Sequence, residues 1–134
     1  MRRIHLIVGL LGVVIFVLTG QIMARHTPPV RAMEPELRLM YISRHIYLLG
    51  AALVNLVVGV YLQVARGAWQ RAVQFGGSVL LLLSPALLTL AFLVEPPLGL
   101  AGRSWRGRGG IFTLFAGTLL HALSQIKNRP SAAN

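Results

Sequence analysis

Two of the four histidines lie on helical faces rich in small residues, and imidazole is a good ligand for haem iron. His5 precedes Gly9 by four positions and His121 follows Gly117 by four, so each pair shares one face of a helix. If these helices are antiparallel, both histidines lie toward the same end, each with a glycine one turn deeper. The leading interpretation is close packing of membrane helices through small residues. The chief alternative is ligation of a b-type haem by His5 and His121, with the glycines admitting the flat macrocycle.

A short motif bears on the haem interpretation. The segment Arg3-Ile4-His5-Leu6-Ile7-Val8-Gly9-Leu10, which continues to Thr19-Gly20, resembles the histidine-bearing first helix of some small membrane b-type cytochromes. The resemblance covers roughly 18 of the 134 residues, and it implies haem b held by His5 and His121. The chain departs from that family because a full set of haem histidines cannot be matched. His5 is also expected at the membrane edge, with His121 about one turn deeper.

A second group of polar residues is expected near the opposite membrane surface. Arg44 and His45 interrupt an apolar run, Glu95 follows another, and Arg103 lies in the next loop. A buried arginine costs about 2.5–3.5 kcal/mol at mid-membrane on insertion scales, so Arg44 should reach the interface or pair. We expect Glu95 to pair with either Arg44 or Arg103. Asn55 lies on the Arg44 face about three turns deeper and should bring an amide into the bundle interior. We interpret this cluster as a structural ion pair; the alternative is a polar vestibule for a headgroup, a quinone or a proton.

The residue inventory excludes most enzyme chemistry. The chain has no Asp and no Cys, only three Glu residues, and a single lysine, Lys127. Paired catalytic carboxylates, a Ser-His-Asp triad and a two-metal carboxylate cage are therefore not expected, and no phosphate-binding GxxxxGK[ST] loop or HExxH motif is present. A site from His26, His45 and either Glu34 or Glu36 has suitable ligand types but no recognised spacing. We predict neither a catalytic site nor a metal site.

Four apolar runs must position these residues. They cover about 4–24, 41–62, 73–94 and 110–126, and 55% of the chain is hydrophobic against 12% charged. About 20 residues cross a bilayer as a helix, and backbone amides inside lipid must pair within their own segment. The sequence therefore predicts an all-α integral membrane protein with one domain over 1–134. We expect a four-helix transmembrane bundle with up-down-up-down topology and a flexible tail over 127–134.

Local signals refine the predicted helices. The basic start of the chain looks like that of a signal peptide, but the apolar run exceeds the usual 7–15 residues, so we expect a retained helix. Glu34 as a cap and Pro35 at the first helical position predict that the second helix begins near residue 35. Pro85 should kink the third helix, because proline removes one backbone hydrogen bond.

The formal net charge of +10 comes from thirteen basic and three acidic residues. The basic residues lie at the ends of the apolar runs, so anionic lipid headgroups are the expected partner and nucleic acid is not. Four crossings place six basic residues on the side of the termini and seven on the other: Arg2, Arg3, Arg66, Arg71, Lys127 and Arg129 against Arg25, Arg31, Arg38, Arg44, Arg103, Arg106 and Arg108. This near balance gives little information about which side of the membrane the termini face. The basic pair directly before the first helix favours cytoplasmic termini in a bacterial inner membrane.

These observations favour a small non-enzymatic membrane protein that serves as an accessory or interaction subunit of a larger membrane complex, or as a homo-oligomer. The first alternative is a b-type haem protein for electron transfer or redox sensing. The second is a small transporter or a lipid- or quinone-binding protein, although the predicted helices carry few polar groups to line a path.

Overall fold

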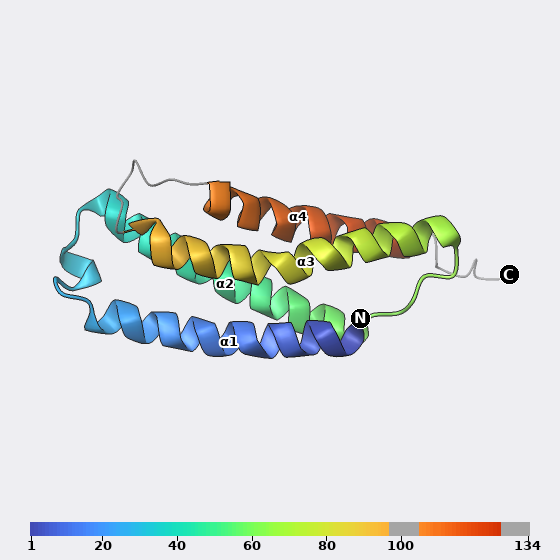
Figure 1. Ribbon diagram of the computed structural model, residues 1–134, viewed down its shortest axis with the longest axis horizontal. Helices are drawn as coiled ribbons and strands as arrows, with labels where there is room; N and C mark the ends of the chain where they lie inside the picture. The colour runs from blue at the N-terminus through green and yellow to red at the C-terminus, as the bar shows by residue number, and fades with distance from the viewer. Residues whose placement is uncertain (97–104, 127–134) are drawn as a thin grey trace, which may run out of the picture.

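The computed structural model describes residues 1–96 and 105–126, and all regular structure in these ranges is helical. The helices are α1 (Arg2–Arg25), α2 (Pro35–Tyr61), α3 (Ala68–Val94) and α4 (Trp105–Ile126), with a short 3-10 helix, η1 (Val30–Ala32), between the first two. They lie roughly along one axis, with α1 and α4 on opposite sides of α2 and α3 (Figure 1). The predictions for Arg103 and for the tail 127–134 lie outside the described residues.

Three helices are long and apolar enough to cross a membrane. They are α1 with 24 residues and α2 and α3 with 27 each. Large apolar side chains cover the outer face of α1, where Leu10, Leu11 and Val17 are each more than half exposed. Such a surface suits lipid and not water. The predicted all-helical membrane fold is confirmed at this level, and α4 is shorter, with 22 residues, and less apolar.

The helices begin earlier than the apolar runs. The second helix begins at Pro35 with Glu34 at the cap position, as predicted from the sequence. The third begins at Ala68, where the Gln70 side chain accepts a hydrogen bond of 3.0 Å from the Gly67 backbone N–H. Polar residues with good helix propensity extend these helices beyond their apolar parts, so hydrophobicity alone underestimates their length.

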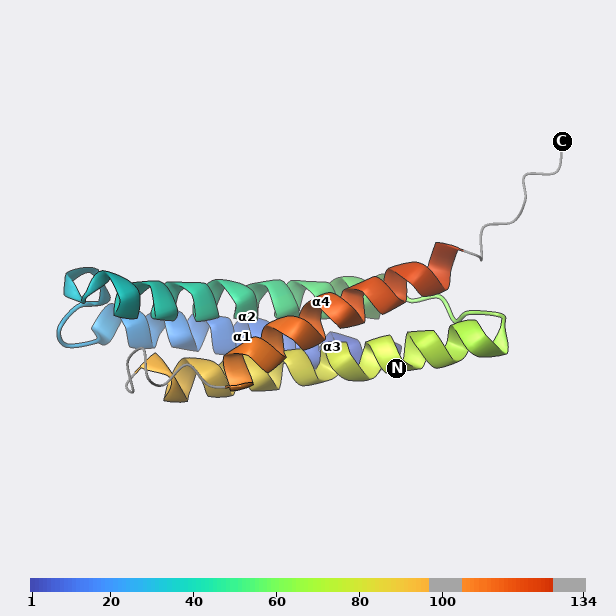
Figure 2. The same cartoon turned by 90° about the horizontal axis from the view of Figure 1, so that it is seen from above.

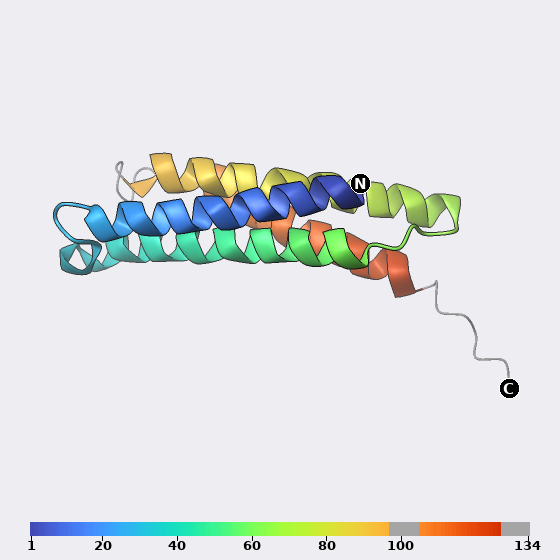
Figure 3. The ribbon, with the colours of Figure 1, turned by 90° about the horizontal axis from the view of Figure 1, so that it is seen from below.

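Glycines set the contact between α1 and α2, which lie side by side (Figure 3). A Cβ atom added at Gly9 would lie 2.7 Å from the Leu56 side chain, and one at Gly59 would lie 2.7 Å from Leu6. Residue numbers rise along α1 as they fall along α2 through these contacts, so the two helices are antiparallel. Without side chains at these glycines, the two backbones approach closely.

Glycines also allow close contact between α3 and α4. A Cβ atom at Gly117 would lie 2.8 Å from Leu81, and one at Gly110 would lie 2.8 Å from Leu88. The seven-residue spacing on both helices keeps the contact on one stripe of an antiparallel pair. Figure 2 shows α4 lying obliquely across α3. The described chain therefore contains two helical hairpins, α1–α2 and α3–α4.

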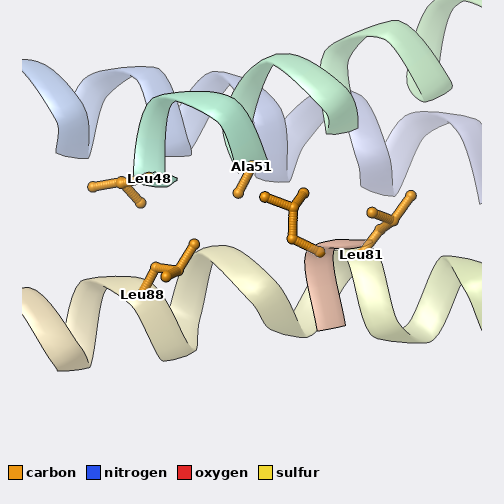
Figure 4. Close-up of a cluster of buried hydrophobic side chains, with 5 residues drawn as sticks. Leu48, Ala51, Leu81 and Leu88 are labelled. Atoms are coloured by element: carbon orange, nitrogen blue, oxygen red, sulfur yellow. The ribbon is translucent and has the colours of Figure 1, made fainter. Parts of the chain in front are cut away.

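An apolar core connects the hairpins through α2 and α3. Leu48 and Ala51 of α2 face Leu81 and Leu88 of α3, and all four are fully buried (Figure 4). Leu114 of α4 completes this cluster. The same two leucines of α3 thus contact α2 on one side and the glycines of α4 on the other, which positions the polar groups described next.

Candidate functional site

The interior contains a polar network between His5, Asn55 and the backbone of α3. His5 is fully buried, and its Nδ1 lies 2.7 Å from Asn55 Oδ1. The Asn55 amide nitrogen donates to the carbonyl oxygens of Ala51 and Leu81, both at 2.9 Å. These bonds use both amide hydrogens, so Asn55 Oδ1 acts as the acceptor and His5 Nδ1 is the donor.

Pro85 explains why Asn55 is needed at this position. Proline has no backbone N–H, so the carbonyl of Leu81, four residues earlier, lacks its usual helical partner. The Asn55 amide supplies the missing donor from α2. The sequence placed Asn55 on the Arg44 face about three turns deeper, with its amide in the bundle interior. Asn55 is fully buried there, and its hydrogen-bond partners are His5 and the backbones of α2 and α3.

The other ring nitrogen of His5 is the unusual atom of this site. Because Nδ1 donates to Asn55, Nε2 of the neutral ring carries a lone pair. Nε2 is buried and has no hydrogen-bond partner in the described part of the chain. The His5 side chain has no exposed surface, so protein atoms and not lipid headgroups surround the ring. Neighbouring helices cover His5 although it lies in the first turn of α1.

His121 lies beside His5, as the sequence predicted for antiparallel first and fourth helices. The two ring centroids are 6.0 Å apart and the ring planes are nearly perpendicular. Nε2 of His121 forms a 3.0 Å hydrogen bond with the Ser78 hydroxyl, and the Ser124 hydroxyl donates to the His121 carbonyl. The sequence interpretation missed Ser78. It shares a helical face with Pro85, seven residues later, and that spacing was the available signal.

The glycines beside the two histidines serve helix packing. The Leu56 side chain of α2 occupies the space beside Gly9, and the Leu81 side chain of α3 occupies the space beside Gly117. The donor set of two imidazoles suits haem iron, but protein atoms occupy both glycine faces in this arrangement. A macrocycle between the histidines would require these leucines to move.

A second polar cluster lies at the other end of the molecule, where Arg44 pairs with Glu95. Arg44 Nη2 lies 2.7 Å from Glu95 Oε2, and Nε donates to the same oxygen at 2.8 Å. The Gly107 backbone N–H donates to Glu95 Oε1 at 2.8 Å. Glu95 is fully buried, whereas 12% of the Arg44 side chain is exposed. The predicted pairing is present, and through Gly107 it also includes the first turn of α4.

His45 does not join Arg44 and Glu95, although it is adjacent to Arg44 in sequence. Its ring stacks on Phe16 with centroids 4.0 Å apart, and its Nδ1 lies 3.0 Å from the Thr19 hydroxyl. The polar cluster expected from the sequence is therefore divided: Arg44 faces α3 and α4, while His45 faces α1. Successive residues point in different directions on a helix, which accounts for the division.

The polar residues singled out from the sequence thus join helices: Asn55 joins α2 to α3, Glu95 joins α2 to α4, and His45 joins α2 to α1. Comparison with known protein families, curated proteins and solved structures finds no match to this chain.

Proposed function

We propose that this protein is a non-enzymatic accessory subunit that packs against a partner in a bacterial inner membrane. It crosses the bilayer four times, up-down-up-down, with cytoplasmic termini. Three helices are already long and apolar enough to cross. For the fourth crossing, support comes from the contact of α4 with α3 at both Gly110 and Gly117, and from its outer side chains. Phe112, Phe115 and Leu119 are each more than half exposed, as expected for lipid-facing positions.

One observation carries the interaction role: an apolar groove between α1 and α3, with a volume of about 440 Å³. Leu11 and Ile15 of α1 form one wall, and Pro85, Ala86 and Leu90 of α3 form the other. Ala86 and Leu90 are exposed along it. Small residues let a second membrane helix approach closely, so the occupant we assign is a transmembrane helix of a partner subunit.

The hydroxyl group that lines the groove is already hydrogen-bonded within its own helix, and the other lining side chains are apolar. This hydroxyl belongs to Thr89 and donates to the Pro85 carbonyl at 2.7 Å. That bond satisfies the hydroxyl within its own helix, so the groove wall presents side chains suited to van der Waals contact. This favours an apolar helix over a polar substrate.

A photo-crosslinking experiment tests the interaction role. The crosslinking residue would replace Leu90 in the groove or, as the matched control, Phe115 on the outer face of α4; both are exposed large apolar side chains. We expect a discrete protein adduct from position 90 and only lipid adducts from position 115. Ala86→Phe should fill the groove and abolish the adduct while leaving thermal stability unchanged. Lipid adducts alone from position 90, or an adduct that survives Ala86→Phe, would contradict the assignment.

The topology has its own test, which the absence of cysteine makes simple. Thr27→Cys in the first connection and Ala68→Cys at the start of α3 place single thiols at exposed positions. We expect a membrane-impermeant thiol reagent to label position 27 from outside the cell and position 68 only after the membrane is opened. Labelling of both from the same side would contradict the proposed crossings.

A second candidate function, b-type haem binding, is favoured by one observation. Asn55 fixes the His5 ring with its Nε2 lone pair buried, and the His121 ring lies next to it. Hydrogen bonding of one imidazole nitrogen commonly orients the other as a metal ligand. When bound, the haem would supply one-electron chemistry, and His5 and His121 would hold its iron. A reduced-minus-oxidised spectrum of protein purified from haem-sufficient cells tests it, because a colourless preparation excludes this candidate.

A further inference from the structure

A pocket of about 510 Å³ lies where the end of α1, the 3-10 helix η1 and the start of α2 meet. Its apolar part is formed by Met23, Val30 and Ile42, and its charged part by Arg31 and Arg38. The pocket is thus amphiphilic, and it belongs to the end of the molecule where α1 finishes and the next helix begins. In the proposed topology this position lies at the membrane–water interface.

The wall that carries Arg31 is held in place by the bundle. Val30 is 7% exposed and packs in a cluster with Tyr41 and Phe92. His26 Nδ1 donates to the Pro28 carbonyl at 3.0 Å, so its Nε2 is the acceptor for the Tyr41 hydroxyl at 3.3 Å. These contacts tie the connection between α1 and α2 to the helices on either side, so the pocket is part of the folded structure.

The two arginines of the pocket lack the kind of partner that Arg44 has. Both Arg31 and Arg38 are exposed, and neither forms an ion pair with a carboxylate in the described ranges. Arg44, by contrast, is neutralised by Glu95. Two uncompensated guanidinium groups beside an apolar surface complement a ligand with an anionic head and a hydrocarbon chain.

We propose that this pocket binds an anionic phospholipid. The Arg31 and Arg38 guanidinium groups hold the phosphate, for which their planar donor geometry is well suited. One acyl chain lies against Met23 and Ile42 and continues along the exposed apolar surface of α2, where Ile46 is 60% exposed. The lipid fixes this end of the bundle at the height of the headgroups. The site rests on the proposed crossings but shares no residue with the α1–α3 groove, so its failure is distinguishable from failure of the proposed partner.

Native mass spectrometry of delipidated protein tests the site. The probes are phosphatidylglycerol and phosphatidylcholine, added to the full chain in detergent. We expect tight binding of one phosphatidylglycerol molecule and about tenfold weaker binding to the double variant Arg31→Gln, Arg38→Gln, since each basic residue near the surface contributes noticeably to anionic lipid attraction. Ile42→Trp, which fills the pocket and keeps both charges, should weaken binding as well.

The matched control is Arg66→Gln, Arg71→Gln, which removes the same charge at two exposed positions of the opposite end. It should leave phosphatidylglycerol binding unchanged. Equal loss in both double variants would reduce the effect to diffuse charge attraction and overturn the site. Equal affinity for phosphatidylcholine, or displacement of the lipid by millimolar inorganic phosphate, would also overturn it. Unchanged helix content shows that each variant is folded.

Discussion

The Asn55 side chain donates a hydrogen bond to the Leu81 backbone carbonyl, at 2.9 Å, and so joins the C-terminal half of α2 to the middle of α3. Leu81 is the residue whose carbonyl Pro85 leaves without a helical donor. A proline in one helix and an asparagine in its neighbour therefore act together, although 30 positions separate them in the sequence. Several variants test this relationship and the contacts around it.

Asn55→Leu should lower the free energy of unfolding by about 1–2 kcal/mol, because it leaves the Leu81 carbonyl and His5 Nδ1 without partners. In a Pro85→Ala background, position 85 regains a backbone N–H that can donate to the Leu81 carbonyl, so the same change should cost less. The measurement is a double-mutant cycle from detergent unfolding curves. Strictly additive effects would contradict the coupling.

Glu95→Gln should destabilise the protein by about 3 kcal/mol, near the lower end expected when a buried ion pair loses one charge. The glutamine oxygen can still accept from Gly107 N–H, so the loss reports on the charge of Arg44. Glu36→Gln, at an exposed position, is the matched control and should change little. Thermal unfolding measures both. Equal stability of the two variants would show that the pair contributes nothing.

Gly9→Ala should destabilise the α1–α2 contact by about 1–3 kcal/mol, because the new methyl group would lie 2.7 Å from Leu56 and 2.8 Å from its backbone nitrogen. Gly50→Ala is the matched control on α2, since a Cβ atom there meets nothing within 4 Å. It should be neutral or slightly stabilising through its better helix propensity. A control as damaging as Gly9→Ala would remove the packing explanation.

The His5 ring should be in the neutral form with its proton on Nδ1, as the hydrogen bond to Asn55 requires. Nitrogen-15 NMR of histidine-labelled protein at neutral pH distinguishes the two nitrogens. In Asn55→Leu the preference for Nδ1–H should weaken. A wild-type ring protonated on Nε2 would mean that the amide of Asn55 is oriented the other way.

The sequence predicted those features for which a single large free-energy cost leaves a segment one arrangement. The apolar runs predict the membrane helices because lipid leaves backbone groups no other arrangement. An ion pair of Glu95 with Arg44 or Arg103 was also predicted, since a charged residue within an apolar run requires a partner or a route to the interface, and the structure contains the pair with Arg44. Both inferences depend on composition and sequence position, and neither needs the rotation of a helix about its axis.

The partners of Asn55 and His45 could not be predicted, because they depend on that rotation. Asn55 was expected in the bundle interior, but an apolar helix in lipid has no polar face to show which neighbouring helix its buried side meets. The decisive information was Pro85: a carbonyl freed by proline needs a donor from a neighbouring helix, and Asn55 is the amide at the matching depth. The contacts of His45 with Phe16 and Thr19 were also not predictable, because these two residues of α1 have no distinctive spacing.

The arrangement as two hairpins also bears on biogenesis. Each hairpin closes around its own glycines, so its contacts join residues that are near in sequence and can form early. The Glu95 carboxylate belongs to the second hairpin and its arginine partner to the first. The ion pair between them therefore forms only when the two hairpins dock, which places this contact after the formation of each hairpin during assembly.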